Sequence, residues 1–159
     1  MFREMRTPLS PAISHEDCVE LLKSVPRGIM AVLGDDDYPY ATPLDHWYNP
    51  EDGKLYFHGG PAGHRIDALK KHNKVCYCVM DHGFRREGEW ALNITSVVIF
   101  GKVEFLEDQE KAMKACRQLS YQFPDDNDFI DHEITYTGPG TLCYALEIEH
   151  MTGKFVTED

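Results

Sequence analysis

The sequence predicts a mainly β domain: a small closed or split barrel with two or three helices on its outside. About six segments are rich in β-forming residues, short turns separate most of them, and few stretches have helical periodicity. A parallel βαβ fold needs a helix between nearly every pair of strands, so an antiparallel sheet fits better. The length of 159 residues suits one domain, expected over 1–159 with an extended arm at 1–13.

The expected strands follow the apolar and alternating runs. They cover residues 28–33, 38–48, 54–58, 74–80, 92–106 and 141–150. Gly101 predicts a bulge or bend in the fifth strand. The second strand contains Pro39 and Pro43, which have no amide hydrogen. It is expected either to be a plain edge strand or to leave a gap that exposes backbone groups of Thr42 and Leu44.

The expected helices have recognisable starts. Ser14 and Asp108 are good N-caps before apolar positions at helical spacing. A third helix is expected to open near His64. The Asp-rich segment 123–140 predicts a loop with one short helical turn.

Composition excludes several classes of function. The net charge is −11, the wrong sign for coating a phosphate backbone, so no nucleic-acid partner is expected. No apolar run approaches the roughly 20 residues that span a membrane, so no membrane partner is expected. The five cysteines form no compact framework and no signal peptide is seen, which favours a reducing, cytoplasmic location.

The run LYFHGGPAGHRIDALKKHNKV, residues 55–75, predicts a strand, a glycine-rich turn and a helix start. First turns of helices favour acidic residues, yet His64 and Arg65 stand there. Glycines let a ligand approach the backbone, and helix N-terminal amides bind anions. The alternatives at this point are a phosphate site and a tight turn with a solvated arginine.

Other chemistries lack their motifs. The eight histidines include no His-x-His or H-E-x-x-H pattern, and Cys76 and Cys78 suit the core of a strand, so no metal site is expected. No G-x-S-x-G elbow or G-K-[ST] phosphate loop occurs. A pocket for a single phosphate is what remains, and the planar fork of arginine can grip two phosphate oxygens at once.

The order of PYATPL, LYFHGGPAGHRIDALKKHNKVCYCV, SVVIFGKVEFLED and ALEIEHMTGK resembles the pyridoxamine 5′-phosphate oxidase-like family of FMN-binding split barrels. Within that family the chain is most similar to the nitroimidazole-resistance type. The resemblance covers roughly residues 5–155. It implies a six-stranded antiparallel split barrel and a homodimer that binds two FMN at the subunit interface.

The resemblance also assigns residues. The positions that match cofactor-binding positions of the family are Thr42, Pro43, Leu44, His58, Gly59, His64, Arg65 and Ser96. Thr42 to Leu44 match the strand facing the flavin ring, His64 and Arg65 match the phosphate grip, and Ser96 matches a position offered by the partner subunit. Relatives often carry lysine where Arg65 stands. The sequence at 45–47 departs from the family pattern, so substrate preference cannot be transferred.

Two functions follow as expectations. The first is an FMN-dependent oxidoreductase, related to nitroreductases or pyridoxamine 5′-phosphate oxidases, that passes electrons from a nicotinamide donor to a nitro compound or quinone. His58 is the candidate proton donor or substrate contact, with a structural hydrogen bond as its alternative. The second is a non-catalytic barrel that holds flavin or haem for storage, sensing or protection, and a deazaflavin is a further candidate cofactor.

Overall fold

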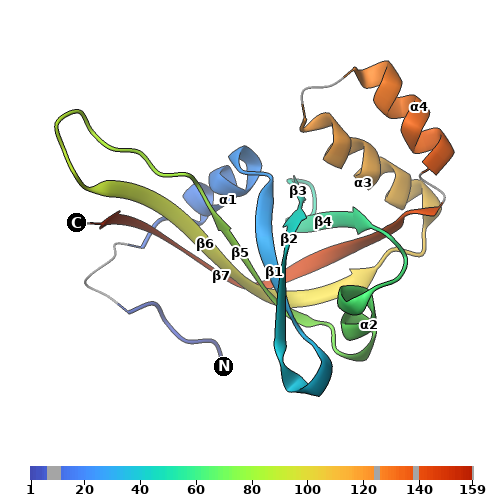
Figure 1. Ribbon diagram of the computed structural model, residues 1–159, viewed down its shortest axis with the longest axis horizontal. Helices are drawn as coiled ribbons and strands as arrows, with labels where there is room; N and C mark the ends of the chain where they lie inside the picture. The colour runs from blue at the N-terminus through green and yellow to red at the C-terminus, as the bar shows by residue number, and fades with distance from the viewer. Residues whose placement is uncertain (7–11, 124–125, 138–139, 159) are drawn as a thin grey trace.

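The computed structural model describes residues 1–6, 12–123, 126–137 and 140–158, and in them seven antiparallel strands form one strongly curled sheet (Figure 1). The strands are β1 Arg27–Leu33, β2 Pro39–Asp45, β3 Trp47–Asn49, β4 Lys54–Gly59, β5 Lys74–Met80, β6 Leu92–Phe105 and β7 Leu142–Glu158. Their order across the sheet is β2-β1-β5-β6-β7-β4-β3. The predicted mainly β, antiparallel fold is confirmed.

The sheet has seven strands rather than the six predicted because the run 38–48 divides at His46. β2 is one edge of the sheet and β3 is the other, and this one residue joins them. The two edges therefore meet at this corner, which is the arrangement of a split barrel. His46 is fully buried there, and its amide donates to the carbonyl of Pro26 (2.8 Å).

The helices are α1 His15–Ser24, α2 His64–Lys71, α3 Gln109–Tyr121 and α4 Asn127–Thr137, with a short 3₁₀ helix, η1, at Asp35–Asp37. α1 and α3 begin where their caps predict. The Ser14 hydroxyl accepts from the amide of Asp17 (3.1 Å), and Asp108 caps α3 through the amides of Glu110 and Lys111. No helix within the described ranges has the length and apolar character needed to cross a bilayer.

The core lies inside the curl of the sheet. Its fully buried side chains include Leu22, Met30, Leu55, Phe57, Tyr77, Val79, Val97, Ile99, Tyr144 and Leu146. α3 covers the outer face of β4 and β7, where Tyr56, Ala115 and Ala145 form a second buried cluster. Residues 55–57 of β4 and 143–146 of β7 are therefore buried at consecutive positions, because these parts of the two strands are covered on both faces.

The prediction for residues 123–140 is wrong over its described part, because 127–137 form the eleven-residue helix α4. The Asp126 carboxylate accepts from the amide of Asp128 (2.9 Å) at its start. Ile130 and Ile134, four residues apart, are buried against α3. A helix forms because this spacing places both side chains on one face.

The end predicted for the last strand is also wrong. β7 does not stop at 150 but stays paired with β6 to Glu158. Gly153 allows the strand to pass close over α1, since a Cβ there would lie 2.5 Å from the Cys18 sulfur. The predicted irregularity at Gly101 is confirmed by a register shift between Phe100 and Gly101, where a Cβ would lie 2.0 Å from the Glu147 carbonyl oxygen.

Candidate functional site

Arg65, at the start of α2, joins three distant parts of the chain. Its Nε donates to the hydroxyl of Tyr144 on β7 (3.1 Å), and its Nη1 donates to the hydroxyl of Thr42 on β2 (2.9 Å). Burial raises the pKa of Tyr144, while the nearby Arg65 lowers it by less, so the phenol stays neutral at pH 7. None of the ion pairs among the described residues includes Arg65. Its charge is therefore held by neutral groups and is available to an anion.

The glycine turn before α2 is open to a ligand. Gly63 precedes the helix with φ of 129°, a conformation that favours glycine, and no side chain caps the first turn of α2. A Cβ at Gly60 or Gly63 would point into open space, and one at Gly59 would lie 3.8 Å from Nη2 of Arg65. Free helix amides and an unpaired guanidinium thus border the same open turn, which is the geometry of an anion site.

The ring of His64 is turned toward the β1–β2 turn. It stacks on Tyr40 of β2, with centroids 4.1 Å apart, and its Nε2 accepts from the amide of Asp35 (3.3 Å). These contacts hold the first turn of α2 against β2, directly beside the bond from Arg65 to Thr42. A direct contact of His64 with a phosphate stays a prediction.

β2 does not have the expected gap that would expose backbone groups of Thr42 and Leu44. The His46 amide donates to the Pro26 carbonyl, and in an antiparallel ladder every second pair counted from such a bond is hydrogen-bonded. The pairs of Leu44 with Gly28 and of Thr42 with Met30 are therefore hydrogen-bonded pairs. The backbone groups of Thr42 and Leu44 therefore face β1, and Pro43 lies on the free edge, where its missing amide hydrogen breaks no ladder bond. β2 is a plain edge strand, and Thr42 reaches the site through its side chain.

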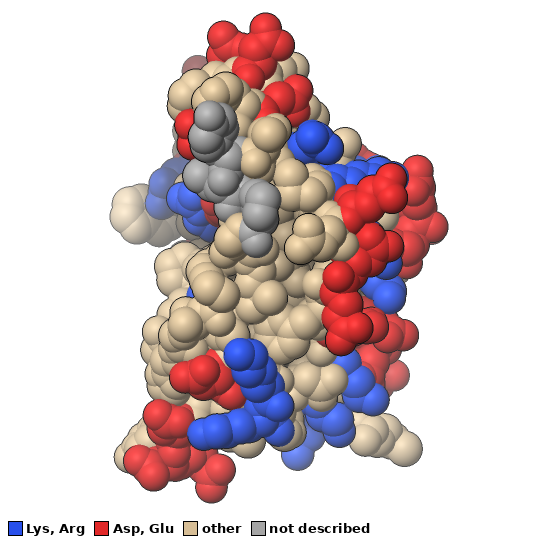
Figure 2. Space-filling view, turned by 90° about the vertical axis from the view of Figure 1, so that its right-hand side faces the viewer, with Lys and Arg blue, Asp and Glu red and all other residues tan. Residues whose placement is uncertain are grey.

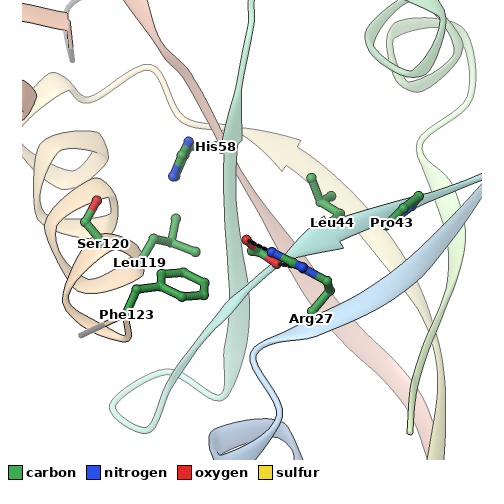
Figure 3. Close-up of a pocket in the computed structure, with 8 residues that line it drawn as sticks. Arg27, Pro43, Leu44, His58, Leu119, Ser120 and Phe123 are labelled. Carbon is green, nitrogen blue, oxygen red and sulfur yellow. Dashed lines mark hydrogen bonds and ion pairs between the residues drawn. The ribbon is translucent and has the colours of Figure 1, made fainter. Parts of the chain in front are cut away.

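A cavity of about 620 Å³ borders β2 and β4, and two of its lining residues, Pro43 and His58, are chain neighbours of Thr42 and Gly59. It is lined by Arg27, Pro43, Leu44, Asp45, His58, Leu119, Ser120 and Phe123. Figure 3 shows the end of α3 on one side, β1 and β2 on the other, and His58 of β4 beside the opening. The structure therefore brings together three residues that the sequence singled out, namely Pro43, Leu44 and His58.

The charges in the cavity are balanced. Arg27 donates from Nε to Oδ1 of Asp45 (2.5 Å) and from Nη2 to Oδ2 (3.1 Å), so this pair has little net charge. The ring of His58 is open to the cavity, but the surrounding protein lowers its pKa, an effect that Asp45 partly offsets. His58 is therefore neutral at pH 7 and can both donate and accept a hydrogen bond.

Ser96 lies away from this site. It is in the middle of β6, opposite Met80 on β5 and Lys154 on β7. Its neighbours in β6, Val97 and Ile99, point into the core, so Ser96 is on the outer face of the sheet. Within the part of the chain that the structure describes, it does not line the cavity at His58.

Four residues at the site were not singled out by the sequence. Tyr144 lies in the predicted strand 141–150, but its bond to Arg65 joins positions 79 apart in the chain. Leu119, Ser120 and Phe123 come from the end of α3, and no spacing in the sequence links that helix to β2. An unpaired hydroxyl facing the core was the only available sign for Tyr144.

Figure 2 shows the side of the molecule that carries α2, α3 and α4. A broad uncharged area occupies its middle. Lys and Arg lie below this area and also above it and at both margins, while Asp and Glu lie at the top, along the right-hand margin and at the lower left.

Comparison with known proteins shows the family and the fold. Residues 14–155 match the family described as pyridoxamine 5′-phosphate oxidase. No curated protein matches the chain. A structure of a putative 5-nitroimidazole antibiotic resistance protein from Bacteroides thetaiotaomicron is 19% identical with a TM-score of 0.76, and the match covers 99% of this chain and 98% of that one.

Two further solved structures share the fold. A FAD-binding protein from Mesorhizobium loti is 21% identical with a TM-score of 0.66, over 94% of this chain and 99% of that one. A FAD and heme binding protein from Mycobacterium smegmatis is 20% identical with a TM-score of 0.69, over 92% of this chain and 74% of that one. At these identities the likeness shows the architecture alone.

Proposed function

The chain belongs to the pyridoxamine 5′-phosphate oxidase family, and on that premise we propose that it is a flavoprotein. It binds FMN and passes electrons from a nicotinamide donor to a small acceptor such as a nitro compound or a quinone. The observation that carries the proposal is the Arg65 guanidinium, which two neutral hydroxyls orient beside an open glycine turn and which forms no ion pair with a carboxylate of the described residues.

The phosphate of FMN would be held by Arg65 and by the amides at the start of α2. Thr42 and Tyr144 fix the guanidinium plane, so little side-chain freedom is lost when an anion binds. Gly59 and Gly60 leave the space that a phosphate needs next to the backbone. One unpaired arginine suits one phosphate group, which favours FMN over FAD.

The flavin ring would lie along Pro43 and Leu44, in and beside the cavity at His58. A volume of about 620 Å³ is within the usual range for a small-molecule site, and its walls are largely apolar. When bound, the flavin supplies the capacity to accept a hydride and to release electrons. The end of α3 forms one wall of the cavity, and neutral His58 can donate a hydrogen bond to an acceptor molecule.

A homodimer is part of the proposal. The outer face of β1, β5 and β6 exposes Ile29, Met80 and Phe100, and in the described chain no helix covers it. Ser96 lies on this face, away from the Arg65 cluster of its own chain. It could reach a flavin only across a subunit interface, and an isologous dimer that buries this face would supply one.

A test starts from the protein as purified. We expect flavin absorption bands that bleach anaerobically with NADH or NADPH and return when a nitroaromatic or a quinone is added. Mass spectrometry of the released cofactor should give FMN. FAD would contradict the phosphate argument, and a flavin that nicotinamides do not reduce would contradict the oxidoreductase.

A second candidate is a barrel that holds flavin or haem without turnover. The observation that favours it is the balanced cavity, where the titratable lining residues are the Arg27–Asp45 pair and one neutral histidine. A Soret band in the purified protein, or bound flavin inert to nicotinamides, would select this candidate.

A further inference from the structure

Two buried cysteines face each other between α3 and β7. The Sγ atoms of Cys116 and Cys143 are 3.0 Å apart, and both side chains are buried in the cluster with Ile130 and Ile134. A disulfide bond is about 2.05 Å long, so an approach of about 1 Å would join the two sulfurs. Both cysteines are reduced in this structure.

The pair is chemically asymmetric. The hydrogen bond from the Cys143 thiol lowers the pKa of Cys116, an effect that burial partly offsets. The same bond raises the pKa of Cys143, as do burial and the adjacent Cys116. Cys143 also lies 3.4 Å from the carbonyl oxygen of Ala112, which is an alternative acceptor for its single S–H hydrogen. Cys116 is therefore the better thiolate, and Cys143 keeps its proton.

Small molecules can approach Cys116. It lines a cavity of about 200 Å³ together with Glu107 and Gln109, both exposed, and a second cavity of about 150 Å³ together with the exposed Phe129. Cavities that share lining residues with the surface admit small neutral solutes. His58 lines the second cavity as well, so the cysteine pair borders the candidate flavin site.

We propose that Cys116 and Cys143 form a dithiol site that a hydroperoxide oxidises to a disulfide. The Cys116 thiolate attacks one peroxide oxygen, the O–O bond breaks, and hydroxide or alkoxide leaves. The sulfur of Cys143 then attacks the sulfenic sulfur of Cys116: the S–S bond forms, the S–O bond breaks and the Cys143 proton leaves with the departing oxygen as water. Overall, two electrons pass from the two sulfurs to the peroxide, which becomes two waters or a water and an alcohol.

The disulfide would fasten α3 to β7. Cys116 precedes Leu119 and Ser120 by about one helical turn, and both line the cavity at His58. The bond would also close the chain segment between 116 and 143, which contains α4, into a covalent loop. Constraining the unfolded chain in this way stabilises the protein.

The test treats the full-length protein with one to ten equivalents of hydrogen peroxide and compares it with the untreated protein. We expect an intact mass lower by about 2 Da, a tryptic peptide that joins Cys116 to Cys143, and full reversal by dithiothreitol. Because α3 and β7 become linked, the Tm should rise by about 5–10 °C in the oxidised form. The intact mass and the cross-linked peptide can be measured without bound flavin and without turnover. A failed flavin assignment would therefore leave this result unaffected.

Two variants sharpen the test. Cys143→Ser, which keeps a hydrogen-bond donor beside Cys116 but cannot form a disulfide, should trap Cys116 as a sulfenic acid that reacts with dimedone. Cys18→Ser, which removes another buried cysteine, should still form the disulfide. If a variant folds poorly, peptide mapping of the peroxide-treated protein without substitutions still shows whether the disulfide forms. Peroxide that leaves both thiols free, or that modifies another cysteine before Cys116, would overturn the proposal.

Discussion

His46 is buried at the corner where β2 passes into β3. Its Nε2 lies 2.7 Å from the carbonyl oxygen of Leu22, which can only accept, so Nε2 carries the hydrogen. The Tyr77 hydroxyl, 2.7 Å from Nδ1, donates to it in the neutral form, although the same hydroxyl also lies 2.8 Å from the Leu44 carbonyl. Burial lowers the pKa of His46 to about 4, against smaller opposing effects from the Leu22 carbonyl and Asp45.

The stability of the protein should therefore depend on the protonation of His46. The unfolded chain takes up this proton near pH 6.5 and the folded chain only near pH 4, so the contribution is complete above pH 6.5 and is lost as the pH falls toward 4. The free energy of unfolding should drop by about 3 kcal/mol across that range from this residue alone. Urea titrations at each pH would measure it.

Variants isolate that contribution. His46→Gln keeps a donor toward Leu22 and cannot titrate, so it should flatten the slope between pH 6.5 and 4, whatever its own cost in stability. His15→Gln, at an exposed position on α1, should keep the slope. An unchanged slope in His46→Gln would show that other groups cause the pH dependence.

His58 titrates at the site itself. Its lowered pKa means that the neutral ring, with one N–H donor, prevails at pH 7. Protonation adds a second donor, so activity that uses His58 as a hydrogen-bond donor should be constant above that pKa and rise as the pH drops through it. In His58→Gln, kcat/KM for an acceptor should be lower by about tenfold at pH 7 and should lack the acidic limb. The measurement needs matched flavin occupancy in both proteins. Full activity with an unchanged pH profile would remove His58 from the mechanism.

At the scale of elements, the stability of α4 depends both on contacts within the helix and on its packing against α3. It rests on α3 through Ile130, which is 7% exposed, while its neighbour Phe129 is 56% exposed. Ile130→Ala should therefore raise amide hydrogen exchange throughout 127–137, because it removes the buried contact that holds the helix. Phe129→Ala removes more apolar atoms but should leave exchange nearly unchanged. Equal exchange in the two variants would mean that α4 does not depend on its packing.

These elements show what the sequence could predict. The starts of α1 and α3 follow from Ser14 and Asp108, because a cap and its helix are neighbours in the chain. The Ile130–Ile134 spacing was present, but the many acidic residues around it favoured a loop. Only the covering surface of α3, the helix that precedes this segment in the chain, decides for the helix.

At the candidate site, too, the sequence could predict what neighbouring residues form together but not the contacts between distant parts of the chain. Arg65 and its glycine turn are contiguous, so charge and spacing offered two alternatives there, an anion site and a tight turn with a solvated arginine. Thr42 and Tyr144, 23 and 79 residues away, meet Arg65 only because β2 and β7 flank the start of α2. The division of one strand at His46 was equally hidden, since it results from the meeting of the two sheet edges.

At the scale of the whole molecule, the uncovered face of β1, β5 and β6 predicts a dimer. Met80 is 61% exposed there and lies opposite Ser96. Met80→Glu should shift the protein from dimer to monomer in size-exclusion chromatography with light scattering, because it places a charge in an apolar interface. It should lose flavin in parallel. Tyr38→Glu, 74% exposed beside the β1–β2 turn, should stay dimeric, and a dimeric Met80→Glu would exclude this face.

The central claim is that Arg65 holds the phosphate of FMN, and paired titrations of the apoprotein with FMN and riboflavin test it most directly. Arg65→Ala should weaken FMN binding by about 10- to 100-fold, and Arg65→Glu by more, because a charge-assisted bond to phosphate is lost. Riboflavin, which has no phosphate, should bind all variants alike. Lys71→Glu, the same charge change at the other end of α2, should bind FMN normally. Unchanged FMN affinity in Arg65→Ala, or an equal loss for riboflavin, would contradict the assignment.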